Sequence, residues 1–68
     1  MSQYLIPDGK TPTLANWCDR AISPRMYWLH NEVGGNGWAI RATKAGSVLE
    51  VSDPELLTFA ILKFGPPK

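Results

Sequence analysis

The sequence predicts a small α+β domain with the order of a winged helix-turn-helix: a short N-terminal strand, two helices, a β-hairpin wing and a C-terminal helix. Apolar residues recur with a helical period through residues 13–33, interrupted by one Ser-Pro pair. After a glycine-rich stretch at residues 34–37 the period becomes two, which is typical of strands. With 68 residues, the chain is expected to form a single domain, residues 1–68.

The first part of the chain predicts a strand followed by a helix. Residues 4–6 favour a short strand, which the turn-forming Pro-Asp-Gly tripeptide at residues 7–9 ends. Residues 13–21 favour a helix, with Thr11 or Thr13 as its N-cap. Its apolar side chains fall at i, i+3, i+4 and i+7, namely Leu14, Trp17, Cys18 and Ala21.

A second helix is predicted directly after the first. Ser23 is a favourable N-cap and Pro24 suits the first helical position, so the helix should run through residues 24–33. The glycines that follow would end it. Because only Ile22 and the cap separate the two helices, we expect a sharp turn between them.

The rest of the chain predicts a hairpin and a third helix. Residues 38–43 and 47–51 favour two strands joined by a short loop at 44–46. Asp53 is a suitable cap for a helix from residue 54 to about residue 64. We expect Gly65, Pro66, Pro67 and Lys68 to form a loose tail.

A chain this short buries only ~60% of its surface, so the predicted core is thin. Apolar packing alone should hold it, because a single cysteine, Cys18, cannot close an intrachain disulfide. We predict that Cys18 is a small core residue. The larger side chains predicted to be buried are Leu14, Trp17, Met26, Leu29, Trp38, Ile40, Leu57 and Ile61.

Composition argues against an enzyme, a metalloprotein or a membrane protein. One cysteine and one histidine, His30, cannot fill a tetrahedral zinc shell, and no nucleophile–base–acid set is apparent. The glycines at residues 34–37 lack the Lys-Ser/Thr of a phosphate-binding loop. We therefore predict no catalytic residue, no metal and no cofactor. No apolar run approaches the ~18 residues of a membrane span, and the cytoplasm is the expected location.

The candidate binding residues lie on the predicted second helix and on the wing. Met26, Leu29 and Val33 share one side of this helix, so Tyr27 and Trp28 point elsewhere, toward either a second buried side or solvent. Arginine and asparagine can read base edges, and aromatic side chains can contact phosphates or thymine methyls. The predicted DNA-binding residues are Arg20, Arg25, Tyr27, Trp28, Asn31, Arg41 and Lys44.

Alternatives exist for the cations in this set. Arg41 and Lys44 flank the hairpin loop, where they can contact DNA or simply be solvated. Arg20 can pair with Asp19 or Glu32 instead of a ligand. The net charge of +1 is small for a nucleic-acid binder.

Two segments resemble a known family. Residues 13–20, entered from a short strand, resemble the first helix of lambda-type phage excisionases. Residues 36–40, a basic loop, residues 48–51 and a closing helix are similar to the wing and third helix of conjugative-transposon excisionases. Both belong to the MerR-like winged-helix group, and the similarity covers residues 4–62. These excisionases are usually markedly basic, whereas the predicted recognition helix here carries one arginine and one glutamate.

The resemblance implies an accessory protein that binds double-stranded DNA beside an attachment site. Several copies would bind cooperatively, bend the DNA and recruit integrase, so that recombination runs toward excision. Arg25, Tyr27, Trp28 and Asn31 would then occupy the recognition helix, with Arg41 and Lys44 on the wing.

The rival hypothesis is a small phage- or plasmid-type protein-binding module or inhibitor. It would use the exposed aromatic side chains of the second helix, Tyr27 and Trp28, as its main contacts. Aromatic residues with few charges nearby are typical of protein interfaces.

Overall fold

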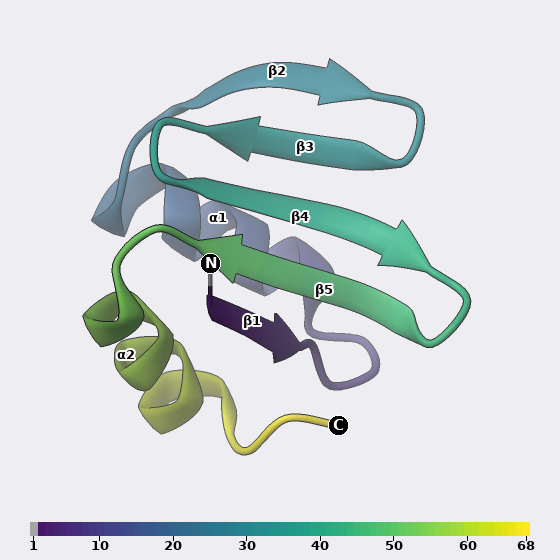
Figure 1. The fold of residues 1–68 in the computed structure, drawn as a ribbon, viewed down its shortest axis with the longest axis vertical. Helices are drawn as coiled ribbons and strands as arrows, with labels where there is room; N and C mark the ends of the chain where they lie inside the picture. The colour runs from purple at the N-terminus through teal and green to yellow at the C-terminus, as the bar shows by residue number, and fades with distance from the viewer. Residues whose placement is uncertain (1) are drawn as a thin grey trace.

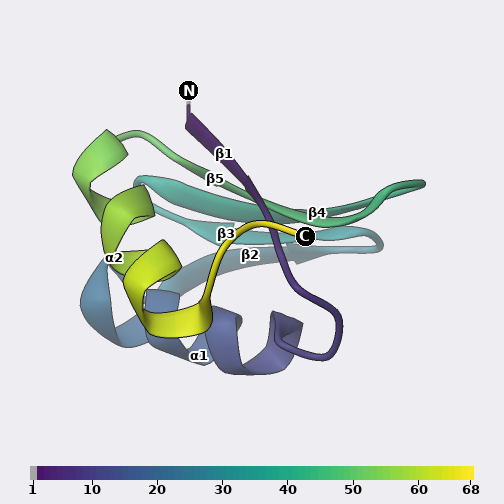
Figure 2. The same ribbon diagram turned by 90° about the horizontal axis from the view of Figure 1, so that it is seen from below.

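Five strands form one antiparallel sheet, and two helices lie on the same side of it (Figures 1 and 2). The computed structural model describes residues 2–68. Neighbouring strands follow the order β1-β5-β4-β3-β2. The elements in chain order are β1 (Ser2–Leu5), α1 (Thr11–Ala21), β2 (Arg25–Leu29), β3 (Glu32–Gly35), β4 (Trp38–Thr43), β5 (Gly46–Val51) and α2 (Pro54–Phe64).

Helix α1 carries the chain from one edge of the sheet to the other. Strands β2 to β5 are joined in sequence by tight turns and pair with their neighbours along the chain. β1 pairs with β5 instead, so β1 and β2 occupy opposite edges (Figure 1). The core lies between the sheet and the two helices.

The predicted first helix, hairpin and last helix are confirmed. α1 covers the predicted residues, although Lys10 rather than a threonine precedes it. The hairpin of β4 and β5 turns at Lys44 and Ala45. α2 is capped as expected, because the Asp53 carboxylate accepts a hydrogen bond of 3.0 Å from the Glu55 backbone N–H. Gly65 follows with a φ of 98°, which suits glycine.

The prediction of a second helix at residues 24–33 is wrong, and with it the winged helix-turn-helix fold. These residues form β2 and the first half of β3, joined by a turn at His30 and Asn31, so the domain is rich in β-structure. The apolar spacing of Met26, Leu29 and Val33 fits a helix. Tyr27 and Trp28, which lie between Met26 and Leu29, favour a strand. Pairing with β3 stabilises the strand over the helix.

Ser23 does not cap a helix. Its side-chain oxygen accepts a hydrogen bond of 2.8 Å from the backbone N–H of Asn36, in the turn between β3 and β4. The indole N–H of Trp38 donates to the Ser23 carbonyl at 2.9 Å. Both bonds hold the segment before β2 against the start of β4.

Two glycines of β3 allow this close packing. A Cβ at Gly34 would lie 2.9 Å from the Trp38 carbonyl oxygen and 2.5 Å from the Tyr27 hydroxyl. A Cβ at Gly35 would lie 2.6 Å from the Pro24 carbonyl oxygen. Glycine inside a strand commonly marks such close approach. Gly34 and Gly35 therefore do not end a helix but allow close packing inside the sheet.

One row of side chains crosses the helix-covered face from edge to edge. Tyr4, Leu49, Ile40, Val33 and Trp28 lie opposite one another on β1, β5, β4, β3 and β2. The first three are buried and the fourth is half-buried, but the last is 77% exposed. The apolar row of the core thus continues to the surface at β2.

Most of the predicted core is confirmed. Leu14, Trp38 and Ile40 are buried, and Cys18 is fully buried, which raises the pKa of its thiol to about 12. Residues that are partly buried against this core include Trp17, Leu57 and Ile61. The prediction is wrong for Met26 and Leu29, which are exposed because β2 lies at the edge of the sheet.

We expect Trp38→Ala to lower the free energy of unfolding by ~3–5 kcal/mol, because it removes a large buried side chain. This loss rivals the whole stability of a small domain. Chemical denaturation followed by circular dichroism measures it. Met26→Ala is the control, and it should change stability by less than about 0.5 kcal/mol because the side chain is exposed. Equal losses in both variants would contradict this assignment of the core.

Candidate protein-binding surface

The two edges of the sheet differ in how they are covered. The C-terminal residues run beside the outer edge of β1, where the Lys68 backbone N–H donates to the Leu5 carbonyl at 3.0 Å (Figure 1). The Tyr4 hydroxyl donates to the Gly65 carbonyl at 2.8 Å. Along the other edge, no strand of residues 2–68 pairs with the outer side of β2. Within residues 2–68, β2 therefore has no segment bonded along its outer side, whereas Lys68 bonds to the end of β1.

The free edge is apolar. Met26, Trp28 and Leu29 are 75%, 77% and 58% exposed, and Tyr27 is exposed as well. Proteins usually protect an edge strand with lysine, proline or a bulge. β2 has an irregular register between Arg25 and Tyr27, but no lysine or proline lies within the strand. Apart from that irregularity, the strand itself has none of these protections against pairing with another chain.

Arg25 ties the start of β2 to α1. Its guanidinium donates to both carboxylate oxygens of Asp19, with a shortest distance of 2.5 Å, and its backbone N–H donates to the same carboxylate at 3.0 Å. These hydrogen bonds hold the pKa of the Asp19 carboxyl below its usual range. Arg25 is therefore a structural link here.

The open face of the sheet carries a polar network. The Tyr27 hydroxyl donates to the Glu32 carboxylate at 2.5 Å, and this bond raises the pKa of that hydroxyl. Arg41 donates to Glu32 at 3.3 Å and also to the Glu50 carboxylate. The network ties β2, β3, β4 and β5 together on the side that the helices leave uncovered.

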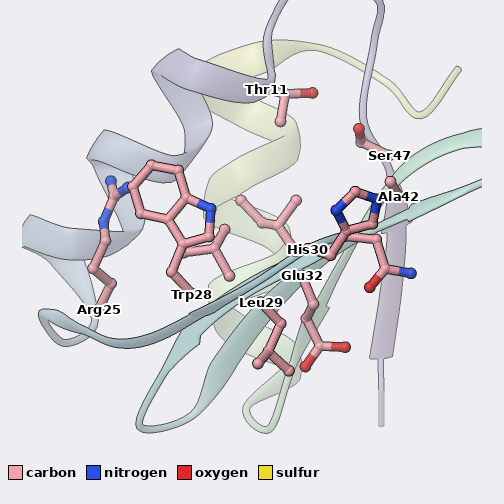
Figure 3. A pocket seen from close by; sticks show the side chains of 11 residues that line it. Thr11, Arg25, Trp28, Leu29, His30, Glu32, Ala42 and Ser47 are labelled. Atoms are coloured by element: carbon pink, nitrogen blue, oxygen red, sulfur yellow. The ribbon is translucent and has the colours of Figure 1, made fainter.

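A hollow of about 220 Å³ lies on the other side of β2 (Figure 3). It extends from Thr11, at the start of α1, to the turn between β2 and β3. Trp28 flanks it, and Val33, Ile40 and Ala42 provide apolar lining from β3 and β4. The hollow therefore lies beside the row of side chains that leads from the core to Trp28.

The structure does not assemble the predicted recognition helix. Arg25, Tyr27 and Trp28 lie on β2, and Asn31 lies in the exposed turn after it. Arg41 lies in β4 within the polar network, not at the tip of a wing. The other predicted residues, Lys44 and Arg20, lie in the turn between β4 and β5 and in the last turn of α1. Duplex DNA binding itself stays a prediction.

Sequence reasoning identified part of this surface and missed part of it. The rival hypothesis singled out Tyr27 and Trp28, which are exposed, but placed them on a helix. The sequence pattern instead predicts Met26 and Leu29 to be core residues, whereas both are exposed. The strand preference of two adjacent aromatic residues was the signal that could have indicated an edge strand.

Comparison of the chain with models of known families, with curated proteins and with solved structures finds no match. Among the described residues, no helix is both long and apolar enough to cross a membrane.

We expect Asp19→Asn to destabilise the protein at neutral pH and to have less effect in acid. The folded-state pKa of Asp19 is lowered, so its stabilising contribution is present above the ordinary carboxyl value of about 4. That contribution is lost as the pH falls through the folded-state pKa. Urea denaturation of parent and variant at several pH values measures the difference.

Asp8→Asn is the control for this experiment. Asp8 pairs with Lys68 at 2.8 Å, but it is largely exposed, and exposed ion pairs contribute little. Its substitution should change stability only slightly at every pH. A constant difference between parent and Asp19→Asn from pH 7 to pH 2 would contradict the role assigned to the Arg25–Asp19 pair.

Proposed function

We propose that this chain is a protein-binding module that accepts a β-strand on its β2 edge, and that its partner is the β2 strand of a second copy. The observation that carries the proposal is the contrast between the two edges. The C-terminal residues bond to β1, whereas β2 leaves apolar side chains exposed and, beyond Arg25, has no strand of residues 2–68 bonded to the backbone groups of its outer side. Strand addition would satisfy those groups and bury those side chains together.

Trp28 would be the central contact. It ends the row that begins with the buried Tyr4, so a strand beside β2 would extend the core by one position. An exposed aromatic side chain offers about 150–250 Å² of contact area. Aromatic side chains near the centre of an interface commonly contribute most of the binding energy.

The chemistry of β2 suits pairing with itself. Antiparallel pairing centred on Trp28 would place the two tryptophans opposite each other and Tyr27 opposite Leu29 of the second copy. Residues 26–31 carry no formal charge with His30 neutral, so no like charges meet across the pair. Arg25, the charged residue of the strand, is already bonded to Asp19.

The expected dimer is weak. A standard interface takes about 800 Å² from each partner, which is close to a fifth of the 4348 Å² that this chain exposes. One strand of five residues offers less than that. Association should therefore depend on concentration, as it does for small interfaces generally.

We propose further that the protein acts by binding and not by catalysis, and that it does so in the cytoplasm. Cys18 is a free, buried cysteine, which suits a reducing compartment.

Sedimentation velocity over a range of concentrations tests the proposal. We expect the parent to change from monomer to dimer as concentration rises. Trp28→Lys should weaken dimerisation by about 100-fold or more, since each copy loses a large apolar contact and gains a like charge. Leu62→Lys is the matched control, because Leu62 on α2 is also 77% exposed. It should change the dissociation constant by no more than about threefold.

Three results would overturn the proposal. The parent could remain a monomer at every concentration reached, Trp28→Lys could dimerise as the parent does, or Leu62→Lys could abolish the dimer. The last result would assign the interface to α2 instead of β2.

A further inference from the structure

A second hollow lies between the two helices, on the side of the sheet that they cover. It is an open groove of about 340 Å³. Thr13, Asn16, Trp17 and Arg20 line it from α1, where their spacing places them on one stripe of the helix. Lys63, in the last turn of α2, lines it from the other side.

The polar groups that line this groove can all donate hydrogen bonds. Arg20 and Lys63 are pure donors, and Thr13 carries a hydroxyl. The Asn16 side-chain oxygen already accepts a bond of 3.5 Å from Arg25, which leaves the amide NH₂ for another partner. None of the lining residues is an aspartate or glutamate. The groove therefore suits an anion.

The two cations of this groove differ from several other cations of the chain, because they form no ion pair within the part of the chain that the structure describes. Arg25, Arg41 and Lys68 are each paired with a carboxylate. Within residues 2–68 no ion pair forms at the remaining cations, which are Lys10, Arg20, Lys44 and Lys63. Two of these four line the same groove from different helices. No carboxylate of residues 2–68 forms an ion pair with Arg20 or Lys63.

Trp17 adds an apolar wall. It is half-buried, and its ring contacts Phe64 edge to face, with 5.9 Å between the ring centres and 79° between the planes. This contact limits the movement of the indole. A ligand in the groove would thus meet cations and a fixed aromatic side chain together.

We propose that this groove binds the phosphate group of a phosphate monoester that carries a planar ring. A phosphate monoester has about −1.5 to −2 charges at pH 7, which matches the two cations. The volume falls in the lower part of the range of about 300–1,000 Å³ that is usual for small-molecule sites. Two sources share this chemistry: a free nucleoside monophosphate and the terminal phosphate of a single-stranded nucleic acid.

Isothermal titration calorimetry at low ionic strength tests the site with adenosine monophosphate, adenosine and inorganic phosphate as probes. We expect saturable binding of the monophosphate, weaker binding of inorganic phosphate and no measurable binding of adenosine. Arg20→Gln and Lys63→Gln should each weaken binding about tenfold, because each removes a charged hydrogen-bond donor. Lys44→Gln is the control and should bind as the parent does, because Lys44 lies outside the groove.

A short oligonucleotide, with and without a 5′-phosphate, distinguishes the two sources. Tighter binding of the phosphorylated strand than of the monophosphate assigns the site to a nucleic acid end, and equal or weaker binding assigns it to a free nucleotide. The proposal is overturned if adenosine binds as well as its monophosphate, if the monophosphate does not bind, or if the oligonucleotide binds equally without its phosphate. Equal loss of binding in all three variants would also overturn it, because that pattern indicates general attraction by net charge.

Discussion

The close backbone contacts at Gly34 and Gly35 determine the path of the chain from residue 23 to residue 38. Because neither residue has a Cβ, the Tyr27 side chain and the Pro24 carbonyl can occupy the space where side chains would otherwise lie. β2 is thereby held against β3 as the last strand of the sheet, and Trp28 lies in register at the end of the apolar row of the core. The bond from Trp38 to Ser23 fixes the same junction from β4. The apolar side chains of β2 are thus exposed at the sheet edge because Gly34 and Gly35 allow β2 to pack closely against β3.

Elements with strong local signals were predictable from the sequence. The Asp53–Pro54 start of α2 and the alternation along β4 and β5 depend on a few adjacent residues, and the structure matches both. The β2–β3 hairpin was not predictable in this way. Met26, Leu29 and Val33 have helical spacing, and the glycines resemble a helix end unless the contact with Pro24 is known.

The candidate site was likewise only partly predictable from the sequence. Exposure of the aromatic pair could be anticipated, but the partners of Arg25 and Arg41 come from elements that only the tertiary fold brings near.

Two surfaces of different chemistry emerge on one small domain. The β2 edge is apolar and, beyond Arg25, uncharged, whereas the groove between α1 and α2 presents two cations with no carboxylate beside them. The first suits a strand of another protein chain, and the second suits a phosphate group. A nucleic-acid partner, predicted from the sequence, would therefore meet Arg20 and Lys63 rather than the residues of β2. The C-terminal residues bond to Leu5 and Tyr4 at the opposite edge, so in the proposed dimer the two copies would pair through β2.

The central claim is that two copies pair along β2, and isotope-filtered nuclear Overhauser spectroscopy tests it most directly. The sample is an equal mixture of ¹³C,¹⁵N-labelled and unlabelled protein at a concentration where the dimer prevails, so that only contacts between copies are recorded. The account predicts intermolecular contacts between Trp28 of one copy and Trp28 of the other, and between Tyr27 and Leu29. An unfiltered spectrum of the same protein should show cross-strand contacts from β2 to β3 within each copy. Intermolecular contacts confined to α2, or a helical pattern of short-range contacts through residues 25–33, would contradict it.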